Sequence, residues 1–168
     1  MPTRPRLRAE ERTPLARLTE GGVHAIVGYQ LAQASIVTNQ VFDDRVGRTG
    51  MRRVEFTILA LIHDNADVTA RQLARALAVT PPNIAIWLDK LESRGLVART
   101  RSSADARMQH LRLTPRARTL VEDSVQSLLE GESEGLGTLS AAEHAMLVEL
   151  LHKVALGRRR HDGAEPDR

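Results

Sequence analysis

The sequence predicts a mainly α-helical chain that carries one small β-hairpin. Three observations lead to this expectation. Apolar residues recur at three- and four-residue intervals over most of the 168 residues. Two short segments of β character flank the polar stretch from Ser102 to Arg107, as the strands of a hairpin flank their turn. Pro81, Gly95 and Pro115 stand at the borders of helical stretches, where such residues start and stop helices.

Four helices are expected before the hairpin. Their expected ranges are residues 22–46, 53–63, 69–77 and 81–95, with a turn and one short strand over 64–68. Thr69 is placed as the N-cap of the third helix. Thr80 is the N-cap of the fourth, and Pro81 occupies its first position, where a missing N–H costs nothing. Gly95 ends the fourth helix because glycine readily adopts the left-handed conformation found beyond helix ends.

The hairpin and two further helices complete the chain. The strands are expected over residues 96–100 and 108–113, and the helices over 115–130 and 141–156, separated by a Gly-rich loop over 131–137. Thr114 and Pro115 repeat the cap-then-proline start, and Ser140 with Glu143 forms a capping box. The expected order is therefore helix, helix, short strand, helix, helix, strand, strand, helix, helix.

The chain is expected to divide into five regions. They are an Arg-rich mobile arm over residues 1–20, a dimerisation helix over 21–50, a central module over 51–116, C-terminal dimerisation helices over 117–157 and a disordered tail over 158–168. The outer helices are apolar on one face, yet they flank the central module rather than complete it. A self-complementary homodimer is the natural use for such faces.

Charge is unevenly distributed along the sequence. Residues 94–118 hold seven arginines and one acid, Asp105. Residues 119–156 hold seven acids and one cation, Lys153. A solvated surface usually mixes its signs, so the basic block indicates a face that binds a polyanion.

Several protein classes are excluded by composition. The chain has no Cys, so a disulfide framework, a thiolate metal site and a thiol sensor are ruled out, in keeping with a reducing cytoplasm. No apolar run approaches 18 residues, so no membrane span is expected. We find no nucleophile elbow, phosphate loop, dinucleotide fingerprint or His-Glu metal helix. We therefore expect no enzymatic activity and no cofactor.

The central module resembles a known family. The matching residues are Leu73-Ala74, Leu77-Ala78-Val79-Thr80, Leu88-Asp89-Lys90-Leu91-Glu92, Arg94-Gly95-Leu96-Val97, Arg99, Asp105-Ala106-Arg107 and Leu113-Thr114. In this order and spacing they resemble the MarR family (multiple-antibiotic-resistance regulators), and the resemblance covers about residues 22–156. It implies a winged helix-turn-helix that dimerises through its N- and C-terminal helices. It also implies a transcriptional regulator, in most members a repressor. Such a dimer binds a pseudo-palindromic operator in double-stranded DNA, with half-sites about one helical turn apart.

Residues expected to contact DNA fall in three groups. They are Thr69, Arg71, Gln72 and Thr80 at helix starts; Pro82, Asn83, Ile86, Lys90 and Arg94 on the fourth helix; and Arg99, Arg101, Ser103, Asp105 and Arg107 in the hairpin. Backbone N–H groups at helix starts favour phosphate. Asn83 suits an adenine edge in the major groove, and Ile86 suits a thymine methyl. Lys90 or Arg94 is expected to reach phosphate.

The hairpin is expected to act as the wing. The resemblance implies that Arg107 enters the minor groove, that Asp105 orients it, and that Arg99 and Arg101 hold the DNA backbone. Where this chain has Ala85 and Ile86, the family more often has polar residues. Direct hydrogen-bond readout is therefore thin, and DNA shape carries more of the specificity.

A small anionic or phenolic effector is also implied by the resemblance. It would bind between the dimer helices and the winged helix and shift the spacing of the two recognition helices. The candidate pocket residues are His24, Tyr29, Gln33 and His63. Two alternatives stay open: a metal-responsive regulator with a His-based site at the dimer interface, and a winged helix that binds only a protein partner. The six histidines form no metal-binding motif in the sequence.

Overall fold

A computed structural model describes residues 12–101 and 109–158 of the chain. Its elements are η1 (Gly21–Ala25), α1 (Val27–Arg45), η2 (Gly47–Thr49), α2 (Arg53–Asp64), α3 (Ala70–Leu77), α4 (Pro81–Ser93), β1 (Val97–Arg101), β2 (Gln109–Leu113), α5 (Pro115–Gly135) and α6 (Ala141–Leu156). The mainly helical fold with one hairpin is confirmed. The bounds of α6 match the expected range to the residue.

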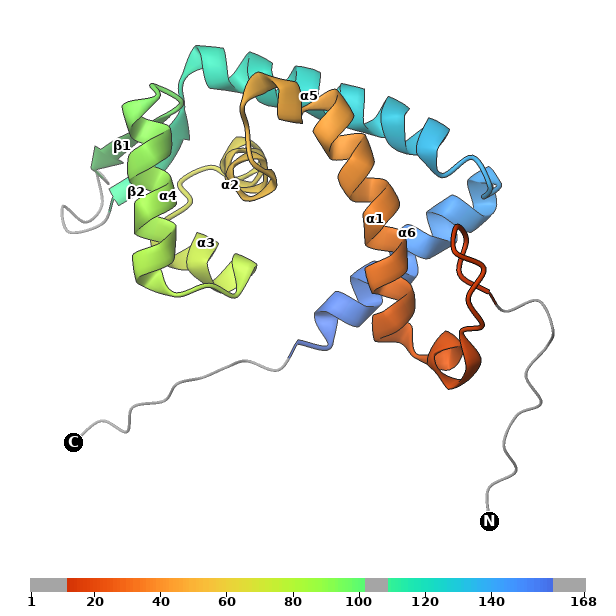
Figure 1. The fold of residues 1–168 in the computed structure, drawn as a ribbon. Coiled ribbons are helices and arrows are strands. Elements are labelled where there is room, and N and C mark those ends of the chain that lie inside the picture. The colour runs from red at the N-terminus through yellow and green to blue at the C-terminus, as the bar shows by residue number, and fades with distance from the viewer. Residues whose placement is uncertain (1–11, 102–108, 159–168) are drawn as a thin grey trace, which may run out of the picture.

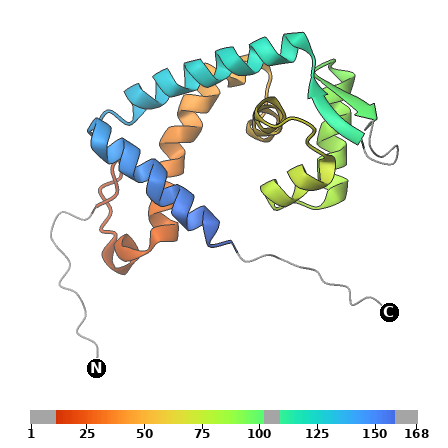
Figure 2. The same cartoon turned by 180° about the vertical axis from the view of Figure 1, so that it is seen from behind.

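The elements form two unequal parts joined by α5 (Figure 1). One part holds α2, α3, α4 and the hairpin. From β2, the helix α5 runs away toward the other part, where α1 packs against it and α6 turns back (Figure 2). The N-terminal segment lies at that second end. The helix-turn-helix is therefore held at one end of a long helical frame.

The hydrophobic core lies almost entirely in the first part. Its largest fully buried apolar side chains are Val46, Ile58, Leu59, Leu73, Ile84, Leu88, Leu91 and Val121. They come from the end of α1, from α2, α3 and α4, and from α5. No residue of α6 is buried. The helix-turn-helix thus forms a closed core together with α2, the hairpin, the end of α1 and the start of α5, whereas α6 adds no buried residue.

The hairpin is a two-stranded antiparallel sheet that is anchored at its base. Its register pairs Val97 with Leu113 and Arg101 with Gln109. Val97 and Leu111 are buried and attach the strands to the core. The short strand expected over residues 64–68 does not form. Instead a single backbone hydrogen bond, from Leu111 N–H to the Val68 carbonyl at 2.8 Å, holds that segment against the hairpin.

The first helix is shorter than expected. The sequence pattern predicts one helix from residue 22, but the chain forms η1, passes through extended backbone at Ile26 (φ −90°, ψ 111°) and only then enters α1. The Gln30 side-chain amide donates to the His24 carbonyl at 2.9 Å, so a side chain of α1 fixes this break. The apolar periodicity continues across the break, so the sequence pattern does not reveal the break.

The two ends of the chain also differ from expectation where they are described. Arg12 and Thr19 form an antiparallel β-bridge, so part of the expected mobile arm folds back as a turn. Arg158, expected in a disordered tail, donates from Nη1 to the Ala76 carbonyl of α3 at 2.7 Å. The rest of the arm and tail lies outside the described residues.

The fifth helix is longer than expected because its glycines face another helix. We predicted a loop over residues 131–137, but α5 continues to Gly135. A Cβ atom on Gly131 would lie 2.8 Å from Val41 Cγ1 and 2.9 Å from Arg45 Cγ, and one on Gly135 would lie 2.8 Å from Val41 Cγ2. These glycines therefore let α1 and α5 approach closely, as small residues do at tight helix crossings.

A Gly131→Ala substitution is expected to lower the free energy of unfolding. Overpacking costs about 1–3 kcal/mol, which outweighs the gain of about 1 kcal/mol from alanine's helix propensity. Gly28→Ala is the matched control, because a Cβ there meets nothing within 4 Å. It is expected to stabilise α1. Thermal unfolding of both variants measures the difference, and an equal rise in Tm for both would contradict the crossing described above.

Candidate nucleic-acid interface

The start of α3 is a well-formed cap. Thr69 N–H donates to Gln72 Oε1 at 2.8 Å, and Gln72 N–H donates to Thr69 Oγ1 at 3.3 Å. Both side chains expected to contact DNA here are thus occupied in capping the helix. Arg71 is exposed and has no ion-pair partner among the described residues. This leaves Arg71 and the first backbone N–H groups of α3 to meet a phosphate.

The start of α4 presents a different surface. Thr80 is the N-cap by position, but its side chain makes no capping hydrogen bond. Pro81 and Pro82 have no N–H, so this helix start offers fewer backbone donors to an anion than that of α3. Asn83 is exposed, and Ile86 is 63% exposed although it is a large apolar residue. These two side chains lie one turn apart on the exposed face of α4.

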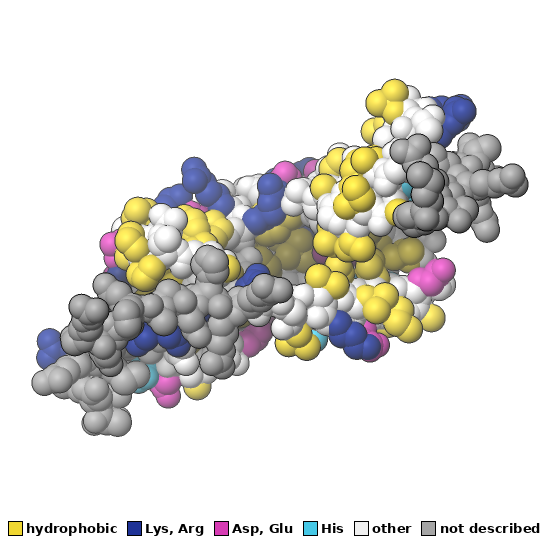
Figure 3. Space-filling model, turned by 90° about the horizontal axis from the view of Figure 1, so that it is seen from below, with side chains coloured by type: hydrophobic (Ala, Val, Ile, Leu, Met, Phe, Trp, Pro, Cys, Tyr) yellow, Lys and Arg dark blue, Asp and Glu magenta, His cyan; other side chains and the backbone are white. Residues whose placement is uncertain are grey.

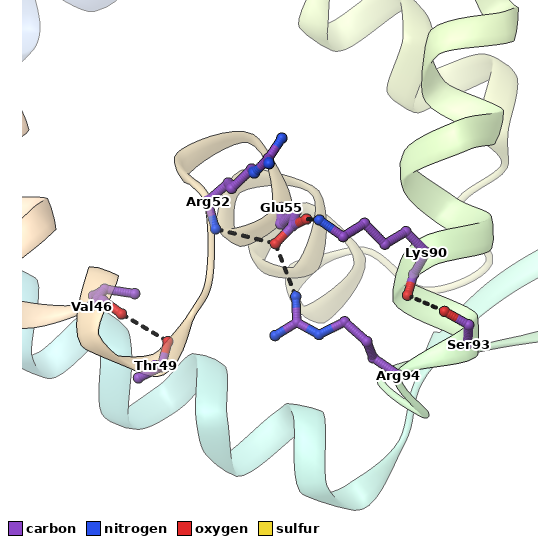
Figure 4. Close-up of polar contacts among 7 residues, drawn as sticks. All are labelled: Val46, Thr49, Arg52, Glu55, Lys90, Ser93 and Arg94. Carbon is purple, nitrogen blue, oxygen red and sulfur yellow. Dashed lines mark hydrogen bonds and ion pairs between the residues drawn. The ribbon is translucent and has the colours of Figure 1, made fainter.

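At the far end of α4 two cations pair with a buried carboxylate of α2. Lys90 Nζ donates to Glu55 Oε1 at 2.7 Å, and Arg94 Nη1 donates to Glu55 Oε2 at 3.0 Å (Figure 4). The Glu55 side chain is completely buried. The structure therefore gives both expected phosphate contacts of this helix a partner inside the chain. Sequence reasoning missed Glu55, although its position three residues after the N-cap Arg52 fits a capping-box acid.

The described arginines of the hairpin also differ in their surroundings. Arg99 forms ion pairs with Asp89 and with Glu92, whose Oε2 lies 3.2 Å from Arg99 Nε, so this arginine ties β1 to α4. Arg101 is exposed at the end of β1 nearest the turn. Of the expected wing contacts, Ser103, Asp105 and Arg107 lie outside the described residues. Arg101 thus marks the point where the described hairpin leads into the expected wing tip.

Three of the four expected pocket residues come together around Glu20. His24 Nδ1 lies 2.6 Å from Glu20 Oε2, and the Tyr29 hydroxyl donates to Glu20 Oε1 at 3.1 Å. Gln33, one turn after Tyr29 on α1, lies near enough to act on the Tyr29 hydroxyl and lower its pKa. The hydrogen bond with His24 is the main cause that holds the pKa of Glu20 below its usual value. The pKa of Tyr29 is raised, mainly by burial and then by its bond to Glu20.

His63 lies apart from this cluster. Its Nδ1 is 2.8 Å from Asp64 Oδ1, and its Nε2 is 3.1 Å from Glu122 Oε1 on α5. The two hydrogen bonds, the one to Asp64 being the stronger influence, raise the pKa of His63 above its usual value. Since the acids occupy opposite nitrogens of the ring, His63 bridges α2 to α5. Within the described residues, no three His, Asp or Glu side chains are grouped so as to hold a metal ion.

A cleft opens between the end of α4, the loop after α1 and the start of α5. Its volume is about 520 Å³, and its lining residues are Thr49, Arg94, Leu96, Arg116, Thr119, Leu120 and Asp123. It holds two guanidinium groups, two hydroxyls and the Asp123 carboxylate beside two leucine side chains. None of the four expected pocket residues lines it. The lining thus combines positive charge, one carboxylate and a small apolar surface.

Comparison with known proteins decides the family. The MarR family model matches residues 51–108, which run from the start of α2 into the wing. The transcriptional repressor CouR, in a complex with a 23-mer DNA duplex, is 27% identical over 82% of this chain and 98% of its own, with a TM-score of 0.74. The chain therefore contains a MarR-family domain over residues 51–108. MarR-family proteins are winged-helix DNA-binding regulators of transcription.

Other structures resemble this chain over most of its length. A mutant MarR from E. coli, complexed with operator DNA, is 25% identical over 76% of this chain and 91% of its own, with a TM-score of 0.66. BpsR of Bordetella bronchiseptica, whose DNA binding is regulated by 6-hydroxynicotinic acid, is 26% identical over 77% and 92%, with a TM-score of 0.67. In the described part of the chain, no helix is both long and apolar enough to span a bilayer.

Proposed function

We propose that this chain is a homodimeric repressor that binds a pseudo-palindromic operator and leaves it when a small effector binds. The observation that carries the proposal is the exposed face of α4. It presents Asn83 and Ile86 beside an arginine-bearing hairpin, on a helix-turn-helix whose opposite side is buried in the core. Such a helix fits the major groove and such a hairpin reaches the neighbouring backbone. CouR and the E. coli MarR mutant, both solved on DNA, support this reading.

Exposed apolar side chains support the dimer. On the N-terminal elements they are Val23, Ile26, Val27, Leu31 and Ile36, and on α6 they are Met146, Val148, Leu150, Leu151, Val154 and Leu156. Figure 3 shows hydrophobic side chains gathered on the half of the molecule that holds α1 and α6. So much contiguous apolar surface is unusual for a monomer and marks an interaction site. A second copy of the chain is the proposed occupant.

The cleft beside Arg94 supports the proposal that a small effector binds this chain. It lies where the winged helix meets α5, so a ligand there touches both the DNA-binding part and the helical frame. A small anionic or phenolic effector would meet its two arginines and two leucines, and a phenolic hydroxyl could also donate to Asp123. The polar cluster of His24, Tyr29 and Gln33 around Glu20 is the second candidate place, in keeping with the pocket expected from the sequence. The regulation of BpsR by 6-hydroxynicotinic acid is a precedent for such control.

Binding to DNA from the region of the protein's own gene tests the proposal. The dimer is expected to bind at least one such fragment more tightly than a random duplex of equal length. Its affinity should fall steeply as salt rises, because each phosphate contact contributes about −0.9 to the slope of log affinity against log salt. Fluorescence anisotropy at several salt concentrations measures both quantities. A chain that prefers no fragment, or whose affinity ignores salt, would instead favour the protein-partner alternative.

A further inference from the structure

Among the described residues, Glu55 is the only charged residue whose side chain is completely buried. Its carboxylate accepts three hydrogen bonds: from Arg52 N–H at 3.1 Å, from Lys90 Nζ at 2.7 Å and from Arg94 Nη1 at 3.0 Å (Figure 4). The first bond caps α2. The other two come from positions one turn apart at the end of α4. A single carboxylate therefore joins the start of α2 to two cations of the proposed recognition helix.

The cations that Glu55 holds are of the kind that binds DNA without regard to sequence. Lys90 follows Asn83 and Ile86 at helical spacing, so it shares with them the face of α4 proposed to meet DNA. Its side chain is 45% exposed and that of Arg94 is 32% exposed, so neither is locked in place by packing alone. Lysine and arginine on such a face add affinity through phosphates, which carry no sequence information.

We propose that Glu55 is a positioning residue that holds Lys90 and Arg94 away from the DNA backbone and so raises the operator's advantage over random DNA. This inference rests on the proposed function and names a residue that sets its specificity. By keeping these two cations on the protein, Glu55 leaves α4 to meet DNA through Asn83 and Ile86. Sequence-independent attraction at this helix is thereby reduced.

The charge of Glu55, rather than its shape, is what this role requires. A glutamine of nearly equal size would cap α2 equally well, since the capping box accepts either residue. Burial tends to raise the pKa of Glu55, but the hydrogen bonds from Lys90 and Arg52 and the charges of Lys90 and Arg94 together hold that pKa below its usual value. The carboxylate is thus charged when the chain binds DNA. A buried charge is costly unless it is paired, which fits a role beyond capping.

Glu55→Gln separates the two roles. It keeps the cap and releases both cations. For a random duplex, the slope of log affinity against log salt is expected to become steeper by about 0.9 for each released cation that contacts a phosphate. One such contact amounts to about eightfold tighter random-duplex binding at 0.1 M salt, taking 1 M as the reference. The ratio of operator affinity to random-duplex affinity should fall. If Glu55 only supports the fold, both affinities fall together and the slope stays that of the wild type.

Three further variants complete the test. Adding Lys90→Gln to Glu55→Gln should return the slope toward the wild-type value. Asp43→Asn removes an exposed carboxylate that pairs with Arg53 at 2.8 Å, and should leave the slope unchanged. If Glu55→Gln does not fold, the Lys90→Gln variant by itself tests the proposed role of Glu55. It should leave the wild-type slope unchanged, and a slope flatter by about 0.9 would overturn the proposal.

Failure of this inference differs from failure of the proposed function. If the wild-type chain binds no DNA, or binds it without salt dependence, the regulator function is wrong. If the wild type prefers its operator but Glu55→Gln keeps both the slope and the affinity ratio, only the role of Glu55 is wrong.

Discussion

Replacing both Leu150 and Val154 by glutamate is expected to separate the proposed dimer and to weaken operator binding at least about a hundredfold, because a monomer engages only one half-site. The two residues lie one turn apart on α6 and are 50% and 59% exposed in the single chain. They contribute nothing to the core of the helix-turn-helix. Carboxylates at these positions would have to be buried unpaired in a dimer interface, which is strongly unfavourable.

The measurement is the molar mass in solution, followed by operator affinity. Thr57→Glu is the control for the added charge, because Thr57 is exposed on α2, a helix that carries none of the exposed apolar residues assigned to the dimer. The control is expected to remain a dimer. The double variant should retain the helical content of the wild type, since its substitutions lie outside the core. A double variant that stays dimeric and binds its operator normally would show that α6 does not form the interface.

An Arg107→Ala variant is expected to bind its operator at least about tenfold more weakly while remaining folded and dimeric. A single arginine contact to DNA is worth about 1–3 kcal/mol, and about 1.4 kcal/mol corresponds to tenfold. The effect should be large here because Ile86, at the centre of the exposed face of α4, supplies no hydrogen bond. More of the binding therefore rests on the wing.

Arg48→Ala is the control for Arg107→Ala. It removes the same charge from η2, outside the helix-turn-helix and the hairpin, where Arg48 is exposed. Operator affinity should change little. Anisotropy titrations of both variants at one salt concentration compare them directly. Wild-type affinity in Arg107→Ala would remove the wing contact from the proposed interface.

The helix-turn-helix could be predicted well because its signals are local. Thr69 and Gln72 form their capping box through neighbouring backbone, and Gly95 has φ +64° where a helix end demands it. Each of these features depends on residues within a few positions along the chain. The same holds for Ser140 and Glu143, which begin α6 at the expected residue.

The features that could not be predicted from the sequence depend mainly on contacts that local periodicity does not record. Gly131 and Gly135 continue a helix because Val41 lies against them, a contact between segments about 90 residues apart. The break at Ile26 has a nearer partner, since Gln30 donates to the His24 carbonyl six residues before it, but this bond leaves no mark on the apolar periodicity. Local pattern assigns the glycines to a loop and the break to a helix, since it contains no information about these neighbours.

The local sequence pattern is enough to predict the family resemblance, the helix-turn-helix with its hairpin, and the residues that caps and periodicity place on α4. It does not predict what those residues can contact, because that depends on which other parts of the chain lie beside them. Lys90 and Arg94 read as phosphate contacts in the sequence, but folding brings the buried carboxylate of Glu55 within 2.7 Å and 3.0 Å of them. A cation's availability depends on the nearest opposite charge, and here that charge lies on another helix more than thirty residues away in the sequence.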